Sequence, residues 1–449
     1  MAFAPQQAIL ELGDTFYDPV QPASFPKTVL RYRNDRAAAS VGLDRLSDAE
    51  WLAHFGRFAP LTDSLTQPLA LRYHGHQFRV YNPEIGDGRG FLFAQMKDIK
   101  GRLLDLGTKG SGQTPWSRFG DGRLTLKGGV REILATEMLE ALGVETSKTF
   151  SLIETGEELH RTDEPSPTRS SVLVRLSHGH IRIGTFQRLA YAQDGEAMAK
   201  LVAYVLRRYY GEEAGEDGPQ RLLAHVAART ARLAAQYMAA GFVHGVLNSD
   251  NINVTGESFD YGPWRFAPTW EPGFTAAYFD QSGLYAFGRQ PEAIYWDAMQ
   301  LAVSLRTLVT EEPLIEALQT FPEAYPREAA KALVWRLGLE PRGFEEDRAL
   351  IEALEPALVA SQVSLDRFFF DAFGGKLPKS YDAPFEGLRA QLALYRPRKR
   401  REHDYWSARP CSMLIDEVEA IWSRIAEADD WAPLYAKVAA IRRMGEALA

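Results

Sequence analysis

Apolar residues change their pattern near residue 192 of this 449-residue chain, and that change restricts the folds available to it. Before residue 192, short apolar segments alternate with loops rich in glycine and proline, a pattern typical of strands. The predicted strands cover residues 91–96, 102–110, 149–155 and 170–176. A helix is predicted between the second and third strands, because apolar residues recur there at helical spacing and Gly143 provides a stop. After residue 192, helical patterns follow one another to the end of the chain.

A strand-rich part followed by a helical part predicts an α+β fold with two lobes. Residues 1–190 are expected to form an extended N-terminal arm, packed on the body, and a lobe built on the strands. Residues 191–449 are expected to form a helical lobe that holds the catalytic loop and ends in a C-terminal helical extension. A cleft between two lobes is the usual place for a binding site.

Composition narrows the class of protein. A hydrophobic share of 45% and a charged share of 24% are ordinary for a soluble globular chain. The net charge of −8 gives no overall field that would draw the chain to nucleic acid or to an anionic membrane. A single cysteine, Cys411, excludes an intramolecular disulfide and a thiolate zinc site. With no secretory signal and no apolar run of about 18 residues, we expect a cytoplasmic enzyme that acts as a monomer, without nucleic-acid or membrane partners.

The segment HGVLNSDNINV, residues 244–254, followed by FDYGP, residues 259–263, has the form of a kinase catalytic loop and metal-binding turn. Kinases use one aspartate to accept the hydroxyl proton, and an asparagine and a second aspartate to hold the metal that bridges the nucleotide phosphates. Asn251 and Asp260 keep the two metal-binding positions. The kinase-like spacing of these loop residues predicts that the two lobes form a protein-kinase-like fold.

Val246 stands where this loop usually carries the catalytic aspartate. A valine neither accepts a proton nor binds a metal, so the ordinary arrangement for phosphoryl transfer is broken. Asp250, directly before Asn251, is the carboxylate that remains within the loop. The alternative interpretation is that these Asn and Asp residues only form a turn.

Lys109 ends a predicted strand, and Glu132 lies in the first turns of the helix that follows. Kinases pair a strand lysine with a helix glutamate, because the carboxylate orients a flexible ammonium that contacts phosphate. Considered without the loop motif, both residues would be interpreted as surface charges. Together with that motif, they predict a phosphate-binding pair.

Further groups suited to phosphate precede or end strands. The segments GDGRG, residues 86–90, and GDGR, residues 120–123, offer backbone amides and an arginine, although their glycines could simply serve turns. Arg175 and Arg182 lie on either side of the SHGH turn and could both face the cleft. Several arginines and a lysine around one site indicate a triphosphate, because they offset its charge. The alternative is that these arginines are solvated strand ends.

Two other features have simpler interpretations. His74 and His76 lie two residues apart in a non-helical segment without a third ligand nearby, which favours a packing role over a metal site. The aromatic-rich segment 264–291 follows Asp260 where kinases have their activation segment. We expect it to pack as a rigid lip that could recognise a substrate.

Taken together, these stretches resemble the selenoprotein O family, also called YdiU, of pseudokinase-like protein adenylyltransferases. The resemblance spans roughly residues 68 to 296, through LALRYHGHQF, GDGRG, LDLGTKGSGQTPWSRFGDGR, VREILATEML, HGVLNSDNINV, FDYGP and GLYAFGRQP. It implies transfer of AMP from ATP to Ser, Thr or Tyr hydroxyls of proteins, with Mg²⁺ or Mn²⁺. It also implies that ATP lies reversed in the kinase cleft, so that the α-phosphate is near the acceptor.

Carried over by position, the resemblance implies that Asp250 accepts the hydroxyl proton, that Glu132 orients Lys109, and that Asn251 and Asp260 hold the metal. The residues that it implies for nucleotide contact are Gly86, Gly88, Arg89, Lys109, Asp121, Gly122, Arg175, Arg182 and Asp260. Two other functions remain open: an ATP-dependent phosphotransferase with Asp250 in an unusual position, and a catalytically silent nucleotide-binding scaffold. A scaffold has no need of a complete set of metal-binding residues.

Overall fold

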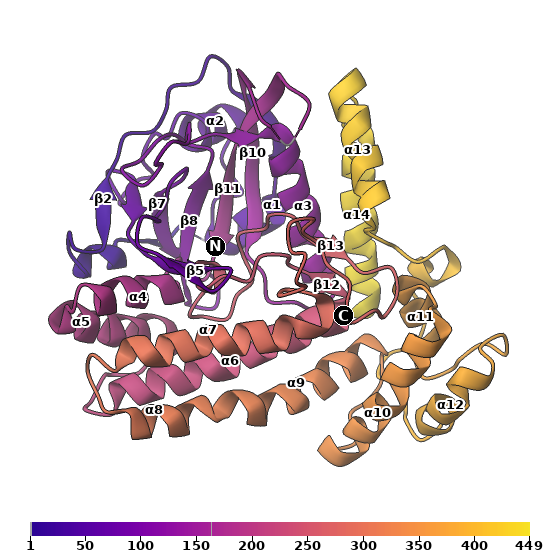
Figure 1. Ribbon diagram of the computed structural model, residues 1–449. Coiled ribbons are helices and arrows are strands. Elements are labelled where there is room, and N and C mark those ends of the chain that lie inside the picture. The colour runs from indigo at the N-terminus through magenta and orange to yellow at the C-terminus, as the bar shows by residue number, and fades with distance from the viewer. Residues whose placement is uncertain (1, 163) are drawn as a thin grey trace.

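A curled antiparallel sheet fills the first part of the chain in this computed structural model, which describes residues 2–162 and 164–449 (Figure 1). The strand order is β2-β4-β7-β8-β11-β10-β3, with β1 beside β7 and β9 beside β11. These strands are β1 (Pro5–Gln6), β2 (Tyr17–Pro19), β3 (Val29–Arg33), β4 (Leu69–Leu71), β7 (Leu92–Lys97), β8 (Leu103–Lys109), β9 (Leu124–Thr125), β10 (Lys148–Leu159) and β11 (Thr168–Ser177). Two small two-stranded sheets stand apart: β5 (Gly75–Gln77) with β6 (Val80–Asn82), and β12 (Phe242–Val243) with β13 (Arg265–Phe266).

The four predicted strands are confirmed as β7, β8, β10 and β11, and the predicted helix is α3 (Leu126–Ala141). The prediction for the N-terminal arm was incomplete. Its segments β1, β2 and β3 pair with β7, β4 and β10, so the arm forms part of the sheet. Strands of two to five residues carry too few alternating positions to be recognised from sequence, and here the partner strand decides the conformation.

Helices make up most of the second part, as the sequence predicts. Over both parts of the described chain, the α-helices are α1 (Asp35–Val41), α2 (Asp48–Phe55), α3, α4 (Ile183–Tyr191), α5 (Gly195–Val205), α6 (Gly218–Ala240), α7 (Gln290–Leu305), α8 (Glu311–Leu318), α9 (Thr320–Arg336), α10 (Phe344–Ser361), α11 (Leu365–Ala372), α12 (Glu386–Leu392), α13 (Ile415–Ala428) and α14 (Ala432–Leu448). Figure 1 shows α6, α7 and α9 below the sheet, and α13 and α14 beside it next to α3. No helix among the described residues is long and apolar enough to cross a membrane.

One hydrophobic core joins the sheet to the helices. It includes Leu134 and Leu139 of α3, Leu201 of α5, Leu223 of α6 and Ile441 of α14, all buried. A separate cluster covers the other face of the sheet with α1 and α2, around the buried side chain of Trp51. Because one core crosses from the sheet to the helices, side chains at their junction are held in fixed positions.

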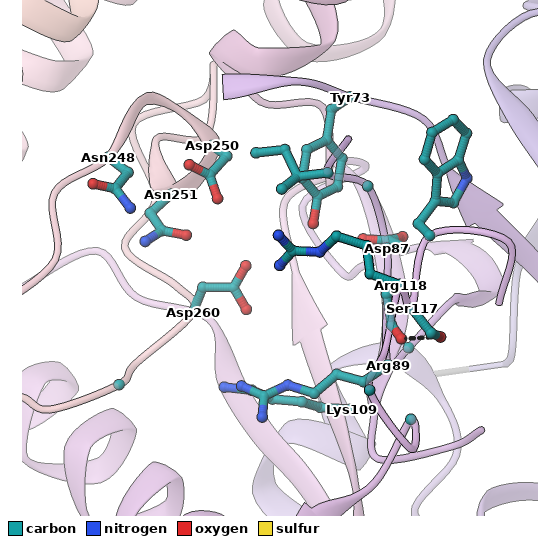
Figure 2. A pocket seen from close by; sticks show the side chains of 18 of the residues that line it. Tyr73, Asp87, Arg89, Lys109, Ser117, Arg118, Asn248, Asp250, Asn251 and Asp260 are labelled. Atoms are coloured by element: carbon teal, nitrogen blue, oxygen red, sulfur yellow. Dashed lines mark hydrogen bonds between the residues drawn. The ribbon is translucent and has the colours of Figure 1, made fainter. Parts of the chain in front are cut away.

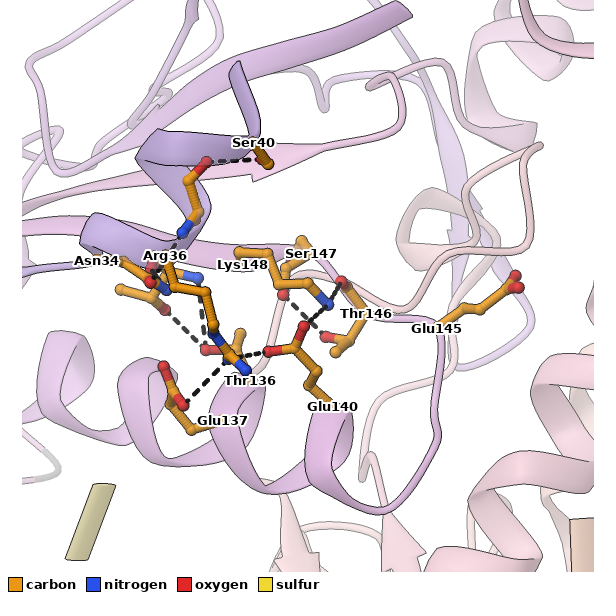
Figure 3. A network of polar contacts seen from close by, with 12 residues as sticks. Asn34, Arg36, Ser40, Thr136, Glu137, Glu140, Glu145, Thr146, Ser147 and Lys148 are labelled. Atoms are coloured by element: carbon orange, nitrogen blue, oxygen red, sulfur yellow. Dashed lines mark hydrogen bonds and ion pairs between the residues drawn. The ribbon is translucent and has the colours of Figure 1, made fainter. Parts of the chain in front are cut away.

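Polar contacts also hold α3 in place. Arg442 of α14 donates hydrogen bonds to both carboxylate oxygens of the buried Glu137, at 2.7 and 2.9 Å. The Tyr32 hydroxyl donates to the same carboxylate at 2.6 Å. Figure 3 shows Arg36 of α1 reaching Glu137 and Glu140, and both contacts are ion pairs. The C-terminal helix and the N-terminal arm therefore fix α3 together.

Candidate active site

A cavity of about 690 Å³ lies where the sheet meets the helical part. Among its lining residues are Gly86, Gly88, Arg89, Lys109, Asp121, Gly122, Arg175, Arg182, Asp250, Asn251 and Asp260. These are all of the predicted site residues except Glu132, which reaches the cavity through Lys109. In Figure 2, Asp250, Asn251 and Asp260 face the cavity from one side, and Arg89 and Lys109 from the other.

Lys109 and Glu132 form a buried ion pair between β8 and α3. The Lys109 ammonium also lies 3.3 Å from the backbone oxygen of Tyr261 and donates to it. Burial lowers the pKa of Lys109, while the Glu132 carboxylate opposes that change. An ammonium held by two acceptors at the cavity wall is fixed in position, as a phosphate-binding lysine must be.

The two glycine-rich segments form one wall. A side chain at Gly86 would collide with the ring of Trp116, because an added Cβ would lie 2.6 Å from its Cγ. The glycines of this segment therefore make room for the loop that contains Trp116 and folds over them. In the second segment, Asp121 pairs with Arg161 at 2.9 Å. Gly122 has a φ of +70°, a conformation that favours glycine.

Asp260 is the electrostatic centre of the site. Its carboxylate pairs with Arg175 and, at 3.0 Å, with Arg182, and both guanidinium groups stack on the ring of Phe259. Burial alone would raise the pKa of Asp260, but Arg175, Arg182 and Lys109 together hold it well below the usual range. The residue has a φ of +62°, which aspartate tolerates better than most side chains. Asp260 is therefore ionised across the physiological pH range and points at the cationic wall.

Asp250 has the opposite electrostatic character. Its side chain is 8% exposed, and Oδ1 is buried without a hydrogen-bond partner. Burial raises the pKa of Asp250 to about 6, although the nearby Arg182 lowers it. The backbone oxygen of Asp250 accepts a hydrogen bond from Arg182 at 2.9 Å, so the loop is fixed while the carboxylate is not. A carboxylate with a pKa near neutrality and a free oxygen is suited to accept a proton.

The residues present fit a divalent cation. Asn251 uses its amide nitrogen to bond the Val246 backbone oxygen at 2.9 Å, and Figure 2 shows its amide oxygen on the cavity side. Over residues 2–162 and 164–449, no three His, Cys, Asp or Glu side chains gather to hold a metal alone. Mg²⁺ usually takes only one or two carboxylates and completes its shell with phosphate and water oxygens. Asp260 and Asn251 offer oxygen donors of this kind.

The two histidines of YHGHQF make packing contacts, as their spacing suggests. His74 bonds the Tyr81 hydroxyl at 2.7 Å through Nδ1. His76 bonds the Gln187 amide at 2.6 Å and lies edge-on to the ring of Trp296. The aromatic segment 264–291 is mostly irregular; it buries the side chains of Trp264, Trp270 and Phe287 but leaves Tyr278 exposed. Its role as a rigid lip that recognises a substrate stays a prediction.

Residues 1–384 match the family model described as protein adenylyltransferase SelO. A relative from Synechocystis sp., named protein nucleotidyltransferase YdiU, is 43% identical over 95% of this chain and 95% of its own length. A relative with the same name from Trichormus variabilis is 42% identical over 98% of this chain and 96% of its own length. Another, from Aeromonas salmonicida, is 37% identical over 86% of this chain and 81% of its own length. The chain belongs to this family. The matched range contains every residue of the site described above, whereas α13 and α14 lie beyond it.

Several residues that shape the cavity were not predicted from the sequence. Tyr73 stacks under the Arg182 guanidinium at 4.1 Å, and Asp87 lies 3.6 Å from the same group. Asn248 lines the cavity and accepts hydrogen bonds from Phe78 N and the Tyr285 hydroxyl. Tyr73 and Asp87 lie within stretches that carry the family resemblance, so a search for partners of Arg182 there could have found them. Asn248 lies in the segment 244–254 that also carries the resemblance, but its contacts could not be predicted because its partners come from distant segments.

Proposed function

We propose that this protein transfers AMP from ATP to Ser, Thr or Tyr hydroxyls of proteins, with Mg²⁺ or Mn²⁺ as the metal. One observation carries the proposal: Asp250, whose pKa is raised to about 6, lines a cavity whose opposite wall holds Arg89 and Lys109. Membership of the protein adenylyltransferase SelO family supports the same reaction. Val246 at the usual base position argues against the phosphoryl transfer of ordinary kinases.

The proposed fold is protein-kinase-like, with an N-terminal lobe over residues 1–190 and a helical lobe over 191–449. Its support is the position of the cavity at the junction of sheet and helices, with β8 and α3 supplying the Lys109–Glu132 pair. The loops after β12 supply Asp250, Asn251 and Asp260. Each of these elements occupies the place along the chain at which a kinase carries the same group.

In the proposed complex, the cationic wall binds the phosphates. Lys109 and the arginines at 89, 175 and 182 offset the charge of the triphosphate, and backbone amides of the two glycine-rich segments contribute further donors. Reversed ATP would put its α-phosphate near Asp250 and its β- and γ-phosphates among the arginines. The leaving pyrophosphate would then be stabilised where its negative charge develops.

Asp260 and Asn251 would hold the divalent cation, which when bound neutralises phosphate charge and makes the phosphorus more electrophilic. The chain itself performs the proton transfer. The acceptor hydroxyl approaches Asp250, whose carboxylate takes its proton as the oxygen attacks the α-phosphorus. The bond between the α-phosphorus and the oxygen bridging to the β-phosphate breaks, and pyrophosphate leaves with that electron pair. The products are a phosphodiester-linked AMP on the protein and pyrophosphate.

ATP labelled on either the α- or the γ-phosphate tests the proposal. The protein is incubated with Mg²⁺ or Mn²⁺ and with casein as a hydroxyl-bearing substrate, and retained label is measured on both proteins. Label retained from α-labelled ATP alone, and lost in the Asp250→Asn variant, supports AMP transfer. Label from γ-labelled ATP alone supports the phosphotransferase, and nucleotide binding without either label supports the silent scaffold; each refutes the proposal.

A further inference from the structure

A row of buried residues extends from the cavity wall, at Lys109 and Arg175, into the interior of the protein. Asp105, Gly107 and Lys109 lie on one face of β8, because side chains alternate along a strand. Arg175 of β11 is the register partner of Gly107. The turn after β11 brings His180 into this row, where it is 4% exposed and Asp105 is 1% exposed. Only Lys109 and Arg175 of this row line the cavity.

The hydrogen bonds of the row define the state of the imidazole. Arg175 Nε lies 3.1 Å from Nε2 of His180, and Nδ1 of the same ring lies 3.3 Å from Oδ2 of Asp105. A guanidinium only donates hydrogen bonds, so Nε2 must be the acceptor and the ring proton must sit on Nδ1, facing the carboxylate. Burial lowers the pKa of His180 and so favours this neutral form. His180 thus links a donor to an acceptor in one orientation.

Both ends of the row are anchored. At the far end, Asp105 accepts a hydrogen bond from the Gln95 amide at 2.7 Å, and Gln95 accepts one from the Ile9 backbone N–H at 2.7 Å. At the near end, Arg175 pairs with Asp260, the proposed metal-binding carboxylate. The row therefore connects the N-terminal segment, through His180, to the centre of the site.

Gly107 leaves the space that the imidazole occupies. A Cβ added at this position would lie 2.6 Å from Cε1 of His180 and closer still to Nε2. Glycine weakens the interior of a strand, since it has no side chain to pack and loses more conformational freedom. Its presence in the middle of β8 is explained by the ring that lies against it.

We propose that His180 is a positioning residue for nucleotidyl transfer, one that fixes the Arg175 guanidinium in the orientation in which it holds Asp260. This inference rests on the proposed function, because that function gives Asp260 its metal. His180 itself touches none of the reacting groups and acts through Arg175. Partners of this kind behind a metal ligand typically change affinity or rate by about 10- to 100-fold.

Three substitutions separate the two hydrogen bonds of the ring. His180→Gln can offer an oxygen where Nε2 lies, so it can still accept from Arg175. His180→Asn reaches only toward Asp105, and His180→Phe keeps the ring shape without either bond. His178, in the same turn, packs edge-on against the ring of Tyr209, so His178→Phe is the matched control.

We would measure kcat and KM for ATP. We would also measure the affinity for Mn²⁺ in the presence of α,β-methylene-ATP, using electron paramagnetic resonance to quantify free Mn²⁺. We expect His180→Phe and His180→Asn to lower Mn²⁺ affinity or kcat by about 10- to 100-fold, and His180→Gln to restore most of the loss. His178→Phe should match the wild type. Equal values for the three His180 variants and the wild type, or equal losses in all three, would overturn the proposal.

Gly107→Ala provides a second test that does not depend on replacing the imidazole. In the wild-type background the added methyl group should displace His180 and lower Mn²⁺ affinity. In a His180→Ala background the methyl group fills vacated space, and its effect should largely disappear. The same loss in both backgrounds would refute the coupling. If the wild type transfers no α-label, the proposed function fails, but the Mn²⁺ affinities still decide the role of His180.

Discussion

Replacing Asp250 by asparagine should separate catalysis from stability. The amide keeps the shape of the side chain, and Oδ1 of Asp250 has no hydrogen-bond partner that the change would break. Loss of a general base usually lowers the rate by about 10²- to 10⁴-fold. We therefore expect retention of α-label on protein to fall by that factor, while binding of ATP changes little.

The same substitution should stabilise the protein at alkaline pH. Burial raises the pKa of Asp250 from 3.8 to about 6, a difference worth about 3 kcal/mol at most. Because the pKa of Asp250 is higher in the folded than in the unfolded state, protonation of this carboxyl stabilises the fold. That stabilisation is fully present below pH 3.8 and is lost as pH rises through 6. At pH 8 the ionised wild-type carboxylate therefore opposes folding, and the neutral amide does not. The stability gain of Asp250→Asn should disappear as pH falls toward 4.

The pH dependence of activity follows from the same pKa. With a pKa of about 6, about half of the base is ionised at pH 6 and about a tenth at pH 5. The rate of transfer at saturating ATP should fall on the acid side in this way, whereas Asp260, with its pKa held well below the usual range, adds nothing there.

Two assays check these expectations together. Urea unfolding of wild type and Asp250→Asn at pH 8 and pH 4 measures the stability difference, and α-label transfer from pH 5 to 8 measures the acid limb. An Asp250→Asn variant that keeps more than about a tenth of wild-type activity would refute the base assignment. A variant less stable than wild type at pH 8 would refute the account of burial.

Three further predictions concern residues that hold Lys109, α3 and the metal. Glu132→Ala leaves the buried Lys109 ammonium without a carboxylate, so unfolding free energy should fall by about 3–5 kcal/mol and the KM for ATP should rise; an unchanged urea midpoint would contradict the pairing. Arg442→Ala removes one of the two cations that pair with Glu137 and should raise the KM for ATP several-fold by loosening α3; a stability loss with unchanged KM would show that α3 holds its position without α14. Asp260→Asn should lower metal-dependent label transfer at least about 100-fold with an unchanged circular dichroism spectrum, and unaltered turnover would exclude Asp260 as the metal ligand.

Several parts of the site could be predicted because their signals are local. The strands and α3 follow from the spacing of apolar residues along short stretches, which depends only on backbone geometry. Asn251 and Asp260 stand at fixed spacing in one loop, so their proximity to Asp250 can be inferred without the rest of the fold. Lys109 and Glu132 could be predicted as a pair only because kinases carry a strand lysine and a helix glutamate at these places along the chain.

Other parts depend on segments far apart in the sequence. The sequence suggests that Arg175 faces a phosphate, but the structure adds Asp260 and the ring of Phe259 as its partners. His180 belongs to a turn whose role becomes visible only once β8 and β11 lie side by side with Gly107 beneath the ring.

The amino-acid sequence by itself determined four of the strands, α3, the change to helices near residue 192, the spacing of the catalytic-loop residues and the loss of the usual base at Val246. The tertiary structure decided which charges are buried and which partners they meet. This is why the pKa of Asp250 rises to about 6 while that of Asp260 falls, although the two aspartates have the same intrinsic acidity and stand only ten positions apart. A pKa responds to desolvation and to charges within a few ångströms, and these are set by packing between segments rather than by neighbours along the chain.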